Sequence, residues 1–336
     1  MEVYEDSAHT YPSPAAAAEV TQQRGARPFL CVYASQVAAC IGANRHKKIS
    51  EAMDATWARV APETYYEAME RNGLKTADQS INEIMAKSQA VKTMLDRSLI
   101  PSESASSEHV ASAYETQLKT VMCDADLQDD EKKAVDDALR RNLYTTFGNV
   151  KEDVALDHVR TLLGIDAVQD NTFYKQQGGT VRLNGDTVPW YVGGKIDAIN
   201  PERSLVIEIK NRINRLFYKI PYHEQIQLQA YLELLQINHG VLCECYSPGS
   251  GGGPGDTDVA AEDAQQCQPV QINMAPMRRD PAAWARDVVP KLQTFVEFLA
   301  ALLENGPDAR KLQDKYLASK RKVAMISSFK PPASYI

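Results

Sequence analysis

Two carboxylates and a lysine are the residues of this chain whose types and spacing best suit chemistry. Asp197 follows a pair of glycines, and ten residues separate it from Glu208-Ile209-Lys210. Side chains alternate along a strand, so Glu208 and Lys210 would share one face while Ile209 points the other way. Leu205-Val206-Ile207 predicts that this strand is buried, where ionisable side chains are costly unless they are used.

These residue types suit the hydrolysis of a phosphodiester bond. Mg²⁺ prefers oxygen ligands, commonly one or two carboxylates with water and phosphate, and a bound cation polarises a phosphoryl oxygen and acidifies water. Asp197 and Glu208 offer carboxylates, and Ile209 offers its backbone carbonyl. The Lys210 ammonium would orient the attacking water or neutralise developing charge. We therefore expect a hydrolase that acts on ester bonds with Mg²⁺, or with Mn²⁺ as a substitute.

A glutamine-rich segment follows the strand and is expected to support this site. Apolar residues recur every four positions over Tyr222–Leu235, which predicts an amphipathic helix. Gln227 and Tyr231 are four residues apart and would lie on the same face. They could brace the metal ligands or touch the DNA backbone; an ordinary polar surface is the alternative interpretation.

Together these motifs resemble the PD-(D/E)XK nuclease core and, more narrowly, the YqaJ viral recombinase or lambda-exonuclease-like family. Two further segments are similar to that family. Phe147-Gly148-Asn149-Val150-Lys151-Glu152 is similar to its Gly-x-x-x-Glu helix, and Tyr33-Ala34-Ser35 is similar to its early Thr-Ala-Ser element. The resemblance covers about residues 28–42 and 147–246.

The resemblance implies a restriction-endonuclease-like α/β core, with a mixed central sheet flanked by helices and a helical insertion. It implies two metal ions and these site residues: Asp197, Glu208, Glu152 and the Ile209 carbonyl as ligands, Lys210 as the catalytic lysine, and Gln227 as a brace. Ser35 would bind a terminal phosphate, which suits a helix N-terminus. We further expect phosphate or DNA-backbone contacts from four residues: Lys195, Arg212, Arg215 and Tyr231.

The implied activity is a deoxyribonuclease, most specifically an exonuclease that acts on duplex ends in recombination, repair or replication and leaves 5′-phosphomonoesters. Implied partners are double-stranded DNA with a free end, a single-strand annealing protein and further copies of the chain. The alternatives are a structure-specific or RecB-like endonuclease and, from a different class, a catalytically inactive DNA-binding recombination scaffold. No iron–sulfur cluster is expected, because the six cysteines lack a suitable spacing. The sequence does not distinguish an exonuclease from an endonuclease. It also does not determine the polarity of digestion, the preference for single or double strands, or the oligomeric state.

Charge and hydropathy limit the classes of protein to which the chain can belong. The 336-residue chain has a formal net charge of −7, which argues against a protein that coats DNA. Basic residues nevertheless gather over 195–219, and an acidic protein can hold DNA if its bases line one groove. No apolar run is long enough to span a membrane, and the N-terminus opens with acids rather than a targeting signal. We expect a soluble intracellular protein, in the host cytoplasm or nucleus if it is viral.

Differences in amino-acid composition divide the chain into a few segments. We expect a disordered segment over 1–27, one nuclease domain over 28–304 and a basic tail over 305–336. Within the domain we expect a helical region over 50–146, the catalytic core over 147–246 and a flexible Gly-rich loop over 247–266. In the core, strands over 173–182 and 188–198 should pair through a turn at Asn184-Gly185. Ser35 should cap a helix.

Overall fold

The computed structural model describes residues 29–96, 106–124, 126–248 and 270–321. The predicted disordered segment over 1–27, most of the predicted loop over 247–266 and the end of the predicted tail lie outside these ranges. The strands are β1 (Cys31–Tyr33), β2 (Val168–Gln169), β3 (Tyr174–Leu183), β4 (Asp186–Gly194), β5 (Ala198–Asn200), β6 (Leu205–Arg212), β7 (His239–Tyr246) and β8 (Gln271–Arg278).

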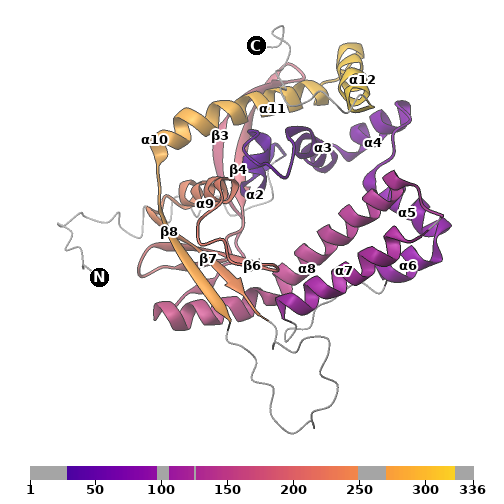
Figure 1. Ribbon diagram of the computed structural model, residues 1–336. Coiled ribbons are helices and arrows are strands. Elements are labelled where there is room, and N and C mark those ends of the chain that lie inside the picture. The colour runs from indigo at the N-terminus through magenta and orange to yellow at the C-terminus, as the bar shows by residue number, and fades with distance from the viewer. Residues whose placement is uncertain (1–28, 97–105, 125, 249–269, 322–336) are drawn as a thin grey trace, which may run out of the picture.

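Helices make up the rest of the described elements (Figure 1). They are α2 (Ala34–Cys40), α3 (Ile49–Val60), α4 (Pro62–Arg71), α5 (Ala77–Lys87), α6 (Gln89–Asp96), α7 (Ser107–Met122), α8 (Asp129–Leu163), α9 (Tyr222–Leu235), α10 (Pro281–Ala283), the π-helical turn η1 (Trp284–Val288), α11 (Val289–Leu303) and α12 (Pro307–Arg321). In the part of the chain that the structure describes, no helix is long and apolar enough to cross a membrane.

Two sheets form the centre of the fold, in the order β1-β4-β3 and β2-β5-β6-β7-β8. The pairs β1–β4 and β6–β7 are parallel and the other neighbours are antiparallel. Helix α9 is the crossover between the parallel strands β6 and β7. The protein is therefore a mixed α/β fold with mixed sheets and flanking helices, as expected.

The hairpin β3–β4 turns where the sequence predicts. Asn184 and Gly185 have φ values of 52° and 88°, the positive values that a two-residue primed turn requires. The strand that we expected to continue from Val188 to Ala198 is interrupted. Strand β4 ends at Gly194, and β5 begins at Ala198 in the other sheet. The three residues between them carry the chain from one sheet to the next.

Strand β6 has different neighbours on its two faces because its side chains alternate. Val206 belongs to the large core that includes α9, whereas Ile207 and Ile209 pack with residues of α8 in a second core. Helix α9 itself packs against strands of both sheets. Its Leu228 and Leu232 are fully buried, and each such leucine contributes roughly 1.5–3 kcal/mol of burial free energy. The α9 face of β6 is therefore fixed with respect to the helix opposite.

The predicted helical region over 50–146 divides into two parts. Helices α3 and α4 join the main core, and Trp57 is fully buried there. The hydrophobic side chains of α5, α6, α7 and the first half of α8 form a smaller core of their own. Figure 1 shows α5, α6 and the first half of α8 extending away from the two sheets, while the second half of α8 runs beneath the sheet that contains β6.

The boundary that we placed at residue 304 was wrong. Pro307–Arg321 forms helix α12 and is not an unpacked tail. Leu312, Tyr316 and Leu317 are buried in the main core, and the Tyr316 hydroxyl donates to Asp54 Oδ1 at 2.9 Å. Ala309, Leu312, Tyr316 and Leu317 recur at the spacing of one helix face, a signal that the expected basic tail left out.

Candidate active site

Three of the predicted site residues meet on the α9 face of β6. Glu208 and Lys210 follow Val206 on that face, because side chains alternate along the strand. Asp197 lies between the sheets, directly before β5, and its neighbour Ala198 pairs with Ile207 of β6. The antiparallel register thus places Asp197 beside Glu208.

The Glu208 carboxylate is buried, with 1% of the residue exposed. Its Oε1 accepts from the Lys210 ammonium at 2.6 Å and from Gln227 Nε2 at 2.7 Å. Its Oε2 is buried without a hydrogen-bond partner among the described residues. A buried carboxylate oxygen without a partner is costly, so this atom is a vacant acceptor directed into the site.

The Asp197 carboxylate is held by the backbone of the catalytic strand. Its Oδ2 accepts from the Ile209 N–H at 2.7 Å. Burial raises the pKa of Asp197, and the nearby Lys210 ammonium partly opposes that shift. The pair of carboxylates is thus fixed by three contacts, one from the Ile209 backbone and two from the side chains of Lys210 and Gln227.

The electrostatics of the pair favour a cation. Burial, and then repulsion from Asp197, raises the pKa of Glu208 to about 8, while Lys210 lowers it. The adjacent acids keep the Lys210 pKa above its usual value in spite of burial. A single ammonium does not compensate two ionised carboxylates, so the pair keeps a proton on Glu208 unless a further cation binds, and the Glu208 Oε2 suits a hard cation in place of that proton.

Glu152 approaches the pair from α8. It is half-buried and accepts a hydrogen bond from Gln169 Nε2 at 3.4 Å. Burial and then the charge of Asp197 raise its pKa. Among the described residues, however, no three His, Cys, Asp or Glu side chains are grouped closely enough to hold a metal ion. Glu152 is therefore near the pair without completing a ligand cluster.

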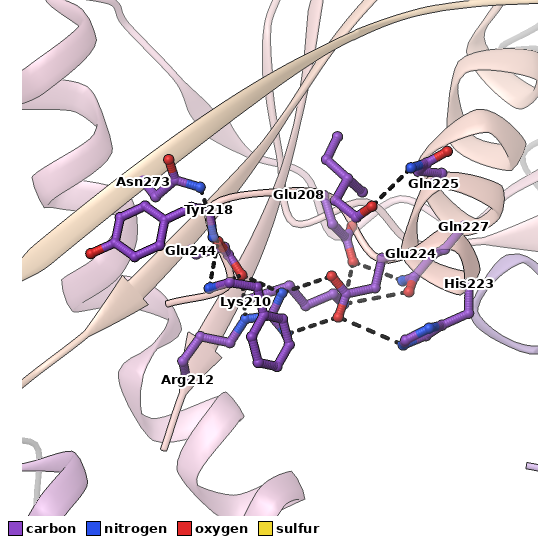
Figure 2. A network of polar contacts seen from close by, with 12 residues as sticks. Glu208, Lys210, Arg212, Tyr218, His223, Glu224, Gln225, Gln227, Glu244 and Asn273 are labelled. Atoms are coloured by element: carbon purple, nitrogen blue, oxygen red, sulfur yellow. Dashed lines mark hydrogen bonds and ion pairs between the residues drawn. The ribbon is translucent and has the colours of Figure 1, made fainter. Parts of the chain in front are cut away.

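Gln227 lies where the sequence predicts, on the face of α9 that meets β6 (Figure 2). The prediction that Tyr231 contacts DNA was wrong, since Tyr231 is only 5% exposed. Its hydroxyl accepts from Gln227 Nε2 at 3.3 Å. A Cβ added at Gly194 would stand 3.0 Å from the Tyr231 ring. Tyr231 thus packs behind Gln227, and the glycine makes room for it.

The prediction that Arg212 contacts phosphate is also wrong. Its guanidinium makes two hydrogen bonds to Glu224, at 2.8 and 2.7 Å, and one from Nε to Glu244 Oε1 at 2.8 Å. Glu244 is fully buried and Glu224 is 6% exposed. Arg212 therefore neutralises two interior carboxylates. Arg215, three residues later, is exposed and remains available to phosphate.

Sequence reasoning missed Glu224 and Glu244 as parts of this site. Figure 2 shows Glu224, Lys210 and Arg212 close together, with Glu244 and Tyr218 beside them. The available signal was Glu244 itself, a charged residue in the middle of the apolar strand β7. A charge at such a position requires a partner, and Arg212 provides it.

Ser35 and Lys195 are exposed, and neither is placed as a cap. Helix α2 begins at Ala34 with Tyr33 in the N-cap position, so the prediction that Ser35 is the N-cap was wrong. Ser35 instead lies in the first turn. Cys243 and Cys245 pack in the second core, and burial raises the pKa of each to about 12.

Fold and site together define a mixed α/β protein in which Asp197, Lys210 and Gln227 surround the buried Glu208 between a central strand and its crossover helix. No family model and no curated protein matches the chain. Among solved structures, it is similar to a phage-related exonuclease from Haemophilus somnus 129PT, with 16% identity, a TM-score of 0.30, and coverage of 67% of this chain and 93% of that one. It is also similar to SSO0001, with 19% identity, a TM-score of 0.27, and coverage of 65% and 86%. Both TM-scores are low, and the function proposed below rests on the site.

Proposed function

We propose that this protein is a metal-dependent deoxyribonuclease. The observation that carries the proposal is the vacant Oε2 of Glu208, buried beside Asp197 and two residues from Lys210. A buried glutamate beside a second carboxylate, with a single ammonium nearby, is destabilising unless it has a use. Carboxylates, an ammonium and an amide in this arrangement suit phosphoryl chemistry.

Asp197 and Glu208 would hold Mg²⁺, with Mn²⁺ as a substitute, and the Ile209 carbonyl would add a third oxygen. The bound cation would polarise the phosphoryl oxygen and acidify a water. Lys210 would orient the attacking water and stabilise charge on the phosphate as the bond to the leaving oxygen breaks. Gln227 would hold both Glu208 and Lys210 in place, because its amide contacts each of them. Glu152 would act through water, or as a ligand for a second ion.

The finer form of the proposal is an exonuclease of the YqaJ type that acts on duplex ends in recombination, with 5′-phosphomonoester products and a single-strand annealing protein as a partner. Ser35 and Lys195 would hold the terminal phosphate. Both are exposed, and Ser35 lies in the first turn of α2, where free backbone N–H groups favour an anion.

The test compares linear duplexes with 5′-phosphate or 5′-hydroxyl ends with a closed circular duplex, in Mg²⁺, in Mn²⁺ and in EDTA. Metal-dependent digestion of linear DNA supports the exonuclease, and the Ser35→Ala/Lys195→Ala double variant should reduce any preference for the 5′-phosphate. Cutting of the circle would favour the endonuclease alternative. DNA binding without cleavage under all conditions would favour the inactive scaffold.

A further inference from the structure

A second site lies beyond the carboxyl ends of the parallel strands β6 and β7. A pocket of about 960 Å³ opens there, lined mainly by the loop over 213–221, the first turn of α9 and residues near Ala43. In sheets of parallel strands, ligands commonly bind outside the carboxyl ends of the strands. This pocket is separate from the carboxylate pair, which lies further back along β6.

The pocket is basic although the chain is acidic. Arg45, Arg215 and Lys219 line it, and all three are exposed. Among the described residues, its lining includes no aspartate or glutamate, and within the described ranges neither Arg215 nor Lys219 forms an ion pair. In a chain with a net charge of −7, this local excess of cations fits an anionic occupant.

Exposed aromatic rings lie among these cations. Tyr218 is 71% exposed, Tyr222 is 62% exposed and Phe217 is 40% exposed. All three line the pocket within six consecutive residues. Rings beside cations are the combination that binds single-stranded nucleic acid, since bases stack on the rings while the cations follow the phosphates.

The fold holds this loop in an uncommon conformation. Tyr218 has φ of 58°, a left-handed conformation that residues other than glycine rarely adopt. The buried Glu244 stabilises it, because Glu244 Oε2 accepts the backbone N–H groups of Phe217 at 3.2 Å and Tyr218 at 3.0 Å. Figure 2 shows Tyr218 beside Glu244 and Asn273, and Asn273 Nδ2 donates to the same carboxylate at 2.9 Å. Non-glycine residues in such conformations are concentrated at functional sites.

The loop is coupled to the catalytic strand through Arg212. Arg212 follows Lys210 on the same face of β6, about 7 Å along the strand. Its guanidinium carbon lies 4.3 Å from the centroid of the Phe217 ring. The row Glu208, Lys210, Arg212 therefore leads from the carboxylate pair to the aromatic wall of the pocket.

We propose that this pocket binds an unpaired nucleotide of a DNA strand, with the base stacked on Tyr218 and Tyr222 and the adjoining phosphates on Arg45, Arg215 and Lys219. Identifying the strand as the nuclease substrate rests on the proposed function; the binding itself does not need cleavage. The phosphates of a duplex would contact the cations. Its bases would not contact the rings, because they are already stacked on one another. The rings therefore favour single-stranded DNA.

The test measures binding without cleavage. The probe is a short single-stranded oligonucleotide that contains 2-aminopurine, in EDTA and in an Asp197→Asn background, compared with a duplex of equal length. Tyr218→Gly removes the ring but keeps a residue that adopts positive φ readily, and Tyr218→Phe keeps the ring. Tyr66→Ala, an exposed tyrosine of α4, is the matched control.

Tyr218→Gly should weaken single-strand binding about tenfold and reduce the stacking-dependent quenching of 2-aminopurine. Tyr218→Phe and Tyr66→Ala should bind as the parent does, and duplex binding should change less. The Arg215→Ala/Lys219→Ala double variant should reduce the slope of log K against log salt by about 0.7 for each phosphate that the protein no longer neutralises, whereas Lys291→Ala on α11 should not.

The two proposals fail in different ways. If Tyr218→Gly changed neither the affinity for single-stranded DNA nor the quenching of 2-aminopurine, the proposed binding role of the pocket would be overturned, whatever the cleavage activity. If binding depended on the Tyr218 ring but the protein cut no DNA with any metal, the proposal for the pocket would be supported and the proposed nuclease function would be overturned. A thermal melting curve of Tyr218→Gly close to that of the parent establishes that weaker binding reflects the ring and not unfolding.

Discussion

The amide nitrogen of Gln227 lies 2.7 Å from Oε1 of Glu208, and this contact leaves Oε2 of the same carboxylate without a partner among the described residues. One residue comes from the crossover helix α9 and the other from the strand β6. The contact fixes the orientation of the carboxylate, so the vacant oxygen stays directed into the site.

Replacing either carboxylate of the pair should abolish cleavage. Asp197→Asn and Glu208→Gln keep the shape of the side chain and remove the charge that holds a cation. Calorimetric titration with Mn²⁺ should show that the variants no longer bind the ion, and DNA affinity in EDTA should stay near that of the parent. Asp153→Asn, an exposed acid on the same helix as Glu152, is the control. Full activity in either variant would remove the basis of the site.

Lys210→Ala should lower the cleavage rate at least about a hundredfold, on the order of 3 kcal/mol of transition-state stabilisation. Lys210→Arg should rescue only part of the rate, because a planar guanidinium does not replace a compact ammonium in the contact with Glu208. Single-turnover rates at saturating Mg²⁺ measure both. If Lys210→Arg restored the full cleavage rate, a positive charge at this position would be sufficient and the shape of the ammonium would not matter.

Gln227→Ala should weaken metal affinity and cleavage by about 10- to 100-fold, the usual effect of removing a residue that orients a ligand. Gln227→Glu should be worse, because it places another negative charge against Glu208. The Mg²⁺ dependence of the initial rate separates the two effects: a positioning role raises the metal concentration needed for half-maximal rate. A change in rate at saturating metal with no change in that concentration would contradict it.

Glu208 should make the metal-free protein less stable as pH rises. Its pKa is 4.5 ordinarily and about 8 in the fold, so between these values the folded state holds a proton that the unfolded chain has released. The free energy of unfolding therefore falls as pH rises through this window. Glu208→Gln should flatten that slope and raise stability at the alkaline end, while abolishing cleavage. Urea denaturation in EDTA at a series of pH values measures it; an unchanged slope would count against the assignment.

Arg212 should matter for folding rather than for DNA binding. Arg212→Met leaves the buried Glu224 and Glu244 without their cationic partner, and breaking such a pair costs about 3–5 kcal/mol. Arg215→Met, at an exposed position of the following loop, should change stability by no more than about 0.5 kcal/mol. Chemical denaturation of both variants gives the comparison. Equal stability of the two would show that the buried ion pairs contribute little.

Local patterns were sufficient wherever the deciding interaction lies within a few residues. The turn at Asn184-Gly185, the bounds of α9 and the shared face of Glu208 and Lys210 all follow from backbone preferences and from side-chain alternation. Gln227 was predicted to brace the site because it shares a face with Tyr231 on the helix that follows β6. These features need no knowledge of distant residues.

Tertiary structure decided what the same residue types do. Arg212 and Arg215 look alike in the sequence, but only Arg212 meets buried carboxylates from α9 and β7. Tyr231 was expected to contact DNA and is buried beside Gly194. Asp197 lies beside Glu208 because the chain crosses between the two sheets directly before β5, a crossing that the sequence did not show. Contacts between segments far apart in the chain determine burial and charge neutralisation, and those two quantities separate a reactive side chain from a structural one.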